Sequence, residues 1–132
     1  MLLLLASCSN PRSVETFAPT EEGSAAYRFE LDLSDTSVFY DLSFYGRIDA
    51  DRALLDSLQA LPLEVVFNAP DNTLYGESVA VPLRRDHPLS ASFSVPYRSH
   101  MRPVLPGTWL LTLTAPDGLE GLQGVGIILN HD

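Results

Sequence analysis

The sequence predicts an all-β fold: a single antiparallel β-sandwich of immunoglobulin-like or jelly-roll type, with one short surface helix near residues 50–60. Seven short segments alternate apolar and polar residues with a period of two, which is typical of half-buried strands. Turn residues separate these segments at regular intervals. Only one segment has helical spacing, whereas an α/β fold needs helices between most of its strands.

The first two expected strands lie at residues 25–33 and 38–48. In the first, Tyr27, Phe29 and Leu31 alternate with charged residues, so one face of the strand is apolar. The second is rich in aromatic and β-branched residues, which favour strands. A Ser-Asp-Thr stretch between them supplies the turn.

Residues 49–61 predict the short surface helix. Its apolar residues recur at helical spacing: Ala53, Leu54, Leu58 and Leu61. Asp49 or Asp51 is suited to cap its first turn, and Pro62 is expected to end it.

The strand pattern then resumes to the end of the chain. Residues 63–69 and 73–83 flank a Pro-Asp-Asn turn and predict a hairpin. Three further strands are expected at 89–97, 107–115 and 125–130. Trp109 falls on the apolar side of its strand, so we expect it in the core.

The N-terminal stretch is too short to span a bilayer, which takes about 20 apolar residues. Leu5, Ala6 and Ser7 precede Cys8, an order that looks like a bacterial lipobox, in which the cysteine thiol receives a lipid. The alternative is an apolar start with a stray thiol. We therefore expect a signal remnant at 1–7, a lipidated cysteine and flexible tether at 8–23, and the sandwich domain at 24–132.

Charge and residue types exclude several classes of function. The net charge is −9, with 17 acidic against 8 basic residues, so nucleic acid is not an expected partner. A single cysteine excludes internal disulfides and cysteine-rich metal sites. His87, His100 and His131 have no metal-binding spacing, and no nucleophile motif is present. We expect no metal, no cofactor, no catalytic residue and no enzymatic activity.

Arginines are concentrated in one segment and form a candidate docking surface. Arg84, Arg85, Arg98 and Arg102, with one aspartate, give residues 84–102 a charge of +3, which suits an anionic partner. The alternative is a solvated loop. A strand predicted between the two pairs would hold them roughly 25 Å or more apart at ~3.3 Å per residue, unless the loops fold back.

Exposed aromatic rings are the other candidate contact. Most of the aromatic residues alternate in phase with core positions, but Tyr45 is out of phase. Tyr45 is therefore the candidate exposed aromatic contact, for example with a sugar ring.

Three stretches, together with the lipobox at Cys8, carry a resemblance that covers most of the chain: "YDLSFYGRI", "LPLEVVFNAPDNTLYGESVAVPL" and "PGTWLLTLTAPDGLEGLQGVGIIL". They resemble the GldH-like gliding-motility lipoproteins of Bacteroidota. The helix-like residues 49–60 and the stretch "RRDHPLSASF" depart from that family's pattern. The resemblance implies a cell-envelope lipoprotein associated with the gliding apparatus and type IX secretion.

Two hypotheses of function follow from these features. The first is a lipid-anchored envelope β-sandwich that acts as a non-enzymatic accessory or scaffold component, with protein partners. It would be held by acyl chains on Cys8 at the outer membrane, facing the periplasm. The alternative is an outer-membrane lipoprotein binding module for a glycan or peptide, which an exposed aromatic cleft around Tyr45 would favour.

Overall fold

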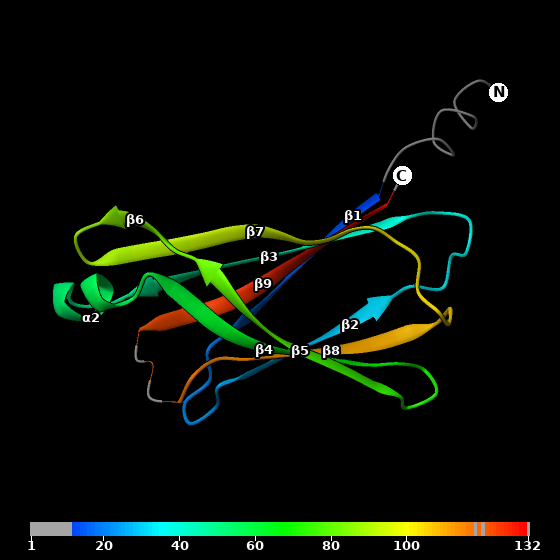
Figure 1. Ribbon diagram of the computed structural model, residues 1–132, viewed down its shortest axis with the longest axis horizontal. Coiled ribbons are helices and arrows are strands. Elements are labelled where there is room, and N and C mark those ends of the chain that lie inside the picture. Colours follow the sequence, from blue (N-terminus) through cyan, green and yellow to red (C-terminus); the bar gives the residue numbers. More distant parts are fainter. Residues whose placement is uncertain (1–11, 118, 120, 132) are drawn as a thin grey trace, which may run out of the picture.

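The computed structural model describes residues 12–117, 119 and 121–131, apart from the side chain of Arg12, and forms two antiparallel sheets packed face to face (Figure 1). Sheet A has the order β1 (Arg12–Pro19), β9 (Leu122–His131), β3 (Tyr40–Asp49), β7 (Ser90–Met101) and β6 (Arg84–His87). Sheet B has the order β2 (Ala26–Asp32), β8 (Thr108–Thr114), β4 (Ala60–Asn68) and β5 (Leu74–Pro82). The predicted antiparallel β-sandwich with one short helix is confirmed.

The core lies between the inner faces of the two sheets. Burial alternates along the strands as the sequence predicts, because successive side chains point to opposite faces. Leu42, Phe44 and Ile48 of β3 are fully buried and belong to the same hydrophobic cluster as Leu111 and Leu113 of β8. Trp109 is 6% exposed, and its indole Nε1 donates a hydrogen bond to the carbonyl oxygen of Leu105 at 2.9 Å. Its predicted core position is confirmed.

The predicted hairpin joins β4 to β5 in an antiparallel pair. Asn72 adopts a positive φ of 68°, which asparagine tolerates in a tight turn. The carboxylate of Asp71 accepts a hydrogen bond from the Thr73 amide at 3.0 Å.

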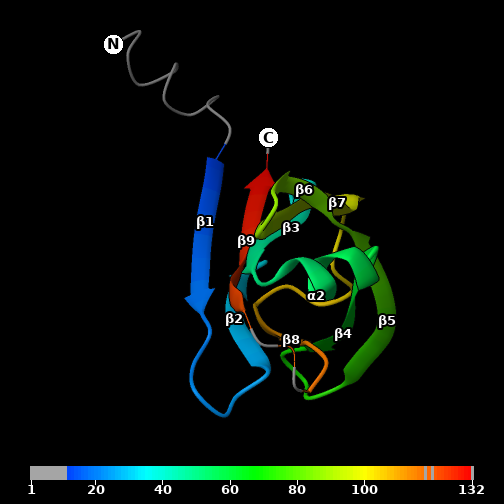
Figure 2. The same cartoon turned by 90° about the vertical axis from the view of Figure 1, so that its left-hand side faces the viewer.

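The predicted helix is α2 (Arg52–Ser57), which lies across one end of the sandwich (Figure 2). Asp51 caps it, since its carboxylate accepts a hydrogen bond from the Leu54 amide at 2.9 Å. The expectation that Pro62 ends the helix is wrong, because Leu58 is already extended and Pro62 belongs to β4. Within the described residues no helix is long and apolar enough to cross a membrane.

The expected tether at 8–23 is wrong over Arg12–Pro19, which form the edge strand β1 paired with β9. The strand lacks apolar alternation because sheet B does not cover it, and Val14 is 57% exposed. Its backbone pairs with β9, and the Phe17 ring lies over Gly124, whose lack of a side chain leaves room for it. Cys8 and the signal remnant lie outside the described residues.

A second difference concerns residues 84–87, which lie between the expected strands 73–83 and 89–97. They form the four-residue strand β6, which pairs with the start of β7 and is exposed along its length. A sequence with no apolar residue becomes a strand here because it only extends the edge of sheet A.

Replacing Trp109 with alanine should destabilise the domain severely. Truncation of a buried tryptophan typically costs about 3–5 kcal/mol, a large share of the stability of a small domain. Tyr45→Ala, at a half-buried position on the outer face of sheet A, should cost much less. Urea unfolding followed by circular dichroism measures both, and equally small losses would contradict the core assignment.

Candidate binding cleft

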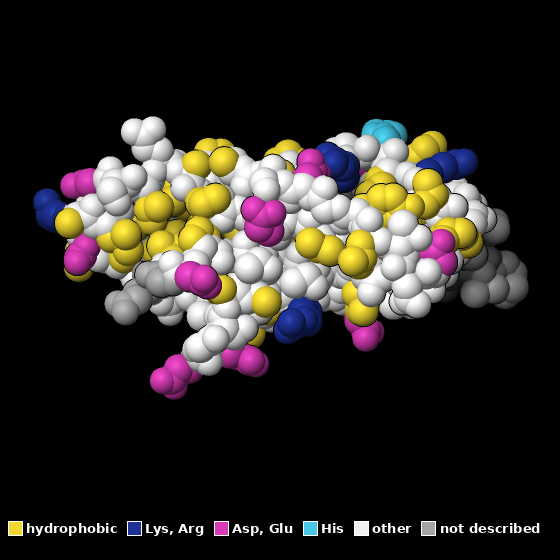
Figure 3. Space-filling model, turned by 60° about the horizontal axis from the view of Figure 1, so that its bottom comes forward, with side chains coloured by type: hydrophobic (Ala, Val, Ile, Leu, Met, Phe, Trp, Pro, Cys, Tyr) yellow, Lys and Arg dark blue, Asp and Glu magenta, His cyan; other side chains and the backbone are white. Residues whose placement is uncertain are grey.

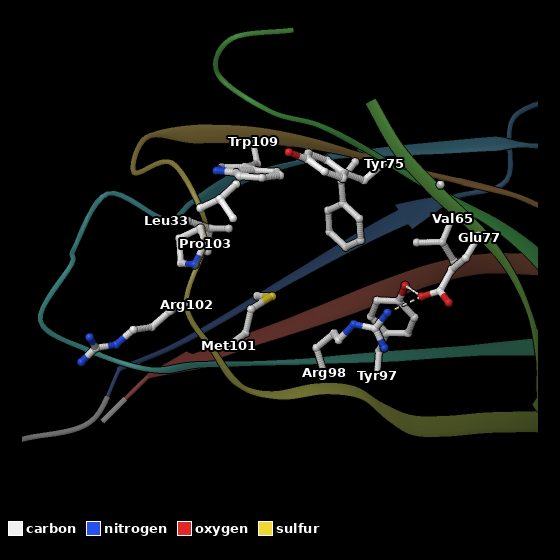
Figure 4. A pocket seen from close by; sticks show the side chains of 13 residues that line it. Leu33, Val65, Tyr75, Glu77, Tyr97, Arg98, Met101, Arg102, Pro103 and Trp109 are labelled. Atoms are coloured by element: carbon white, nitrogen blue, oxygen red, sulfur yellow. Dashed lines mark hydrogen bonds and ion pairs between the residues drawn. The ribbon is translucent and has the colours of Figure 1, made fainter. Parts of the chain in front are cut away.

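A cleft of about 380 Å³ opens between the two sheets, with β5 of sheet B on one side and β7 of sheet A on the other. Figure 4 shows aromatic side chains on one side of the cleft and a charged group on the other. The inner side of β5 becomes more exposed toward this opening: Val81 is 4% exposed, whereas Tyr75 is 45% exposed. The cleft therefore lies where the core of the sandwich ends.

Aromatic rings form the apolar wall of the cleft. Tyr75 stacks on Trp109 with ring centroids 5.8 Å apart, and Phe67 meets Trp109 edge-on at 6.4 Å. Phe67 also stacks on Tyr97 at 6.1 Å, so rings from both sheets are in contact. Such a wall suits an apolar or aromatic ligand group, and Tyr75 is its accessible member.

A charged group joins the two sides of the cleft. The Tyr97 hydroxyl donates a hydrogen bond to the Glu77 carboxylate, and the Arg98 guanidinium donates to the same carboxylate at 2.5 Å. The guanidinium also lies 4.5 Å from the centroid of the Tyr97 ring. Burial raises the pKa of the Tyr97 hydroxyl above its ordinary value, and the hydrogen bond to Glu77 raises it further.

Exposed side chains lie at the end of the sandwich where the cleft opens. Arg102 extends away from the aromatic wall, and its guanidinium lies 4.4 Å from the centroid of the Phe39 ring (Figure 4). Val104, in the segment between β7 and β8, is 72% exposed. Leu110 and Leu74 are also exposed at this end, but they lie on the outer face of sheet B, where both are opposite Asn68 in the register.

Most of the large hydrophobic side chains that are exposed in the described part of the chain lie at this end of the sandwich. The large hydrophobic side chains exposed here are Phe39, Leu74, Tyr75, Val104 and Leu110. In the described part of the chain, only three others are exposed to this degree: Val14, Phe17 and Leu89. Figure 3 views the molecule from the side of sheet B and shows hydrophobic groups near both ends of that face, with acidic groups among them. Such patches often mark interaction sites.

The structure does not bring the four predicted docking arginines together. On β6, Arg84 pairs with Asp86 at 3.1 Å and Arg85 with Asp56 of α2 at 2.5 Å. Arg84 lies opposite Ser92, six residues before Arg98 on β7, a distance of about 20 Å at ~3.3 Å per residue. Only Arg98 and Arg102 lie at the cleft.

Tyr45, the predicted aromatic contact, is not in this cleft. It lies half-buried on the outer face of sheet A, with its ring over Gly126 and 6.2 Å from the ring of Phe17. Its hydroxyl donates a hydrogen bond to Glu15 at 2.6 Å. Burial, together with the Glu15 carboxylate, raises the pKa of Tyr45 to about 12.

The histidines do not form a site. His87 ends β6, His100 lies near the end of β7 with a φ of 51°, and His131 ends β9. Among the residues that the structure describes, no three His, Cys, Asp or Glu side chains are grouped closely enough to hold a metal ion.

The residues of the cleft were missed because alternation assigned Tyr75 and Tyr97 to core positions. Both point inward as predicted, but they lie where the other sheet does not fully cover them. A signal was present in the sequence: Gly76 interrupts β5 between an aromatic and an acidic residue, and such a glycine often marks a close approach of another chain.

No protein-family model matches the chain, and no curated protein is similar to it in sequence. Among solved structures, the chain is similar to a crystal structure from Sulfurospirillum deleyianum, with a TM-score of 0.40 and 9% identity over 91% of this chain and 97% of that one. It is also similar to the globular domain of zebrafish complement 1qA protein, with a TM-score of 0.40 and 10% identity over 92% and 94%. Similarity at this level carries no conclusion about function.

Tyr97 should ionise well above pH 10, the ordinary value for tyrosine. Because its pKa is raised in the folded state, its contribution to stability is fully present below pH 10 and is lost as the pH rises beyond that. Glu77→Gln should lower the Tyr97 pKa, so that the pH range over which this stability is lost becomes narrower. The pKa is measured from the tyrosinate absorbance as the pH is raised. Comparison with Tyr97→Phe shows which part of that absorbance belongs to Tyr97. Glu15→Gln is the control, since it alters the partner of Tyr45 and should leave Tyr97 unchanged.

Proposed function

We propose that the chain is a lipid-anchored cell-envelope β-sandwich that acts as a non-enzymatic accessory or scaffold component with protein partners. The observation that carries this proposal is the aromatic cleft between β5 and β7, with exposed apolar side chains at the same end of the sandwich. The lipobox at Cys8 and the resemblance to GldH-like gliding-motility lipoproteins of Bacteroidota support envelope location and association with gliding or type IX secretion.

Lipidation of Cys8 would also orient the domain. Cys8 and Arg12 are four residues apart, so the chain between them spans at most about 14 Å. Arg12 lies opposite His131, and Tyr40 lies opposite both His131 and Met101, which precedes the Arg102 rim of the cleft. The anchor would therefore hold this end of the sandwich close to the outer membrane, with the body of the domain in the periplasm.

A second candidate function is a binding module for a glycan or peptide ligand. The exposed Tyr75 ring beside the Glu77–Arg98 pair favours it, since an aromatic face next to charged hydrogen-bonding groups suits a polar ligand with an apolar side. The two functions differ in the partner: a scaffold keeps a protein through purification, whereas a capture module exchanges a soluble ligand.

Replacing Cys8 with alanine tests the anchor. Each buried methylene contributes about 0.8 kcal/mol to membrane binding, so two or three acyl chains hold a protein stably. The wild-type chain should incorporate labelled fatty acid and fractionate with membranes, and Cys8→Ala should do neither. Membrane association of the variant, together with no labelling of the wild type, would refute lipidation.

Replacing Val104 with aspartate tests the role of the apolar end. Val104 is 72% exposed, so the change should leave the unfolding midpoint nearly unaltered while removing a protein partner from the affinity-purified complex. Leu89→Asp is the matched control, since Leu89 is 57% exposed in the turn between β6 and β7. Mass spectrometry of both purified complexes gives the result, and equal recovery of partners would contradict a role for this end.

A further inference from the structure

Two strand edges border the cleft. β5 is the last strand of sheet B and pairs with β4 alone in the described part of the chain. β7 pairs with β3, and on its other side β6 reaches only as far as Ser92. An open edge presents backbone N–H and C=O groups that another strand can bind.

The hydrogen-bond phase shows which groups of β5 face outward. In an antiparallel pair, residues alternately bond to the partner strand and point away from it. The Ala69 amide donates to the Thr73 carbonyl at 2.9 Å, and the Leu83 amide donates to the Gln59 carbonyl at 3.3 Å. Thr73, Leu83 and every second residue between them therefore bond toward β4. The backbone groups that point away from β4 therefore belong to the alternate positions Leu74, Gly76, Ser78 and Ala80.

Prolines limit where a strand can be added. Pro82 occupies the next outward position of β5 and has no N–H, so the usable edge ends before it. On β7, the bond from the Ala50 amide to the Leu89 carbonyl shows that Leu89 and every second residue after it bond toward β3. Pro96 is one of the residues in between, so its backbone points away from β3. Pro96 blocks that edge beside the cleft, which leaves β5 as the edge that can accept a strand.

Gly76 lies in the middle of this open edge. A Cβ at Gly76 would meet only the Val65 carbonyl oxygen at 3.5 Å and the Val66 Cγ2 at 3.7 Å, which are ordinary contacts. The fold therefore does not require glycine here, although glycine weakens the interior of a strand. A bare position on an open edge is suited to the close approach of another backbone.

We propose that β5 binds an extended peptide segment of a protein partner as an additional strand, paired along residues 74–78. Alternate side chains of such a strand point to the same face, so an apolar one would enter the cleft beside Tyr75 and Met101. This inference rests on the proposed accessory function and specifies the kind of partner segment.

The charges at the opening select an acidic residue next to that apolar side chain. Glu77 is already bonded to Tyr97 and Arg98. Arg102 is exposed, and no carboxylate of the described residues forms an ion pair with it. An acidic side chain of the peptide would provide that partner, whereas a basic peptide would meet Arg98 and Arg102 with like charge.

The test selects peptides from a phage-displayed library of random dodecapeptides on the full-length chain in detergent micelles. Recovered peptides are synthesised with a fluorescent label, and each is paired with a copy whose alternate backbone amides are N-methylated, which prevents strand pairing. Affinity is measured by fluorescence anisotropy for the wild type, Gly76→Pro and Ser13→Pro. Ser13 is the matched control, because its backbone also points away from the neighbouring strand at an open edge. The bond from the Thr20 amide to the Gln123 carbonyl shows that Thr20 and every second residue before it bond toward β9, and Ser13 is one of the residues in between.

We expect peptides with an apolar residue next to an acidic one. Gly76→Pro should lower the affinity for these peptides at least tenfold, and Ser13→Pro should leave it unchanged. N-methylation of the peptide should abolish binding to the wild type, a result that does not depend on whether a proline variant folds. The proposal is overturned if no recovered peptide meets these conditions, or if a second copy of the chain occupies the edge, so that Gly76→Pro converts a dimer to a monomer. Membrane fractionation of Cys8→Ala does not enter this test, so failure of the anchor and failure of peptide binding are distinguishable.

Discussion

The packing of sheet A on sheet B through their inner faces is the constraint on which the rest of the structure depends. Each strand must place alternate side chains between the sheets, because there is no disulfide to hold the domain together. Phe44, Leu111 and Leu113 are completely buried in this layer. Where the layer ends, between β5 and β7, inward-facing rings remain accessible and line the cleft.

The cleft keeps its form because charged and aromatic contacts connect its sides. Glu77 of β5 bonds to Tyr97 and Arg98 of β7, and the Tyr97 ring stacks on Phe44 of the core at a centroid distance of 4.6 Å. The polar group is therefore supported by core packing rather than by solvent-exposed side chains alone. A cleft of this kind is largely formed in advance, which would reduce the entropy cost of binding a ligand.

β1, at the edge of sheet A, is packed against the rest of the sandwich. Phe17 and Tyr45 pack over Gly124 and Gly126 of β9, and the Tyr45 hydroxyl bonds to Glu15 of β1. β1 is thereby a fixed part of the sandwich instead of a tether. A lipid on Cys8 would then determine the orientation of the domain as well as its location.

The sequence by itself determined the fold class, the hairpin turn at Asn72 and the core position of Trp109, and it limited the helix cap to Asp49 or Asp51, because each depends on local residue preference or on alternation. Only the tertiary structure decided that β1 and β6 are strands, since edge strands are held by backbone pairing that needs no apolar pattern. It also separated the arginines and placed Tyr75, Tyr97 and Glu77 around one cleft. Alternation shows which way a side chain points, but only the packing of the two sheets decides whether anything covers it.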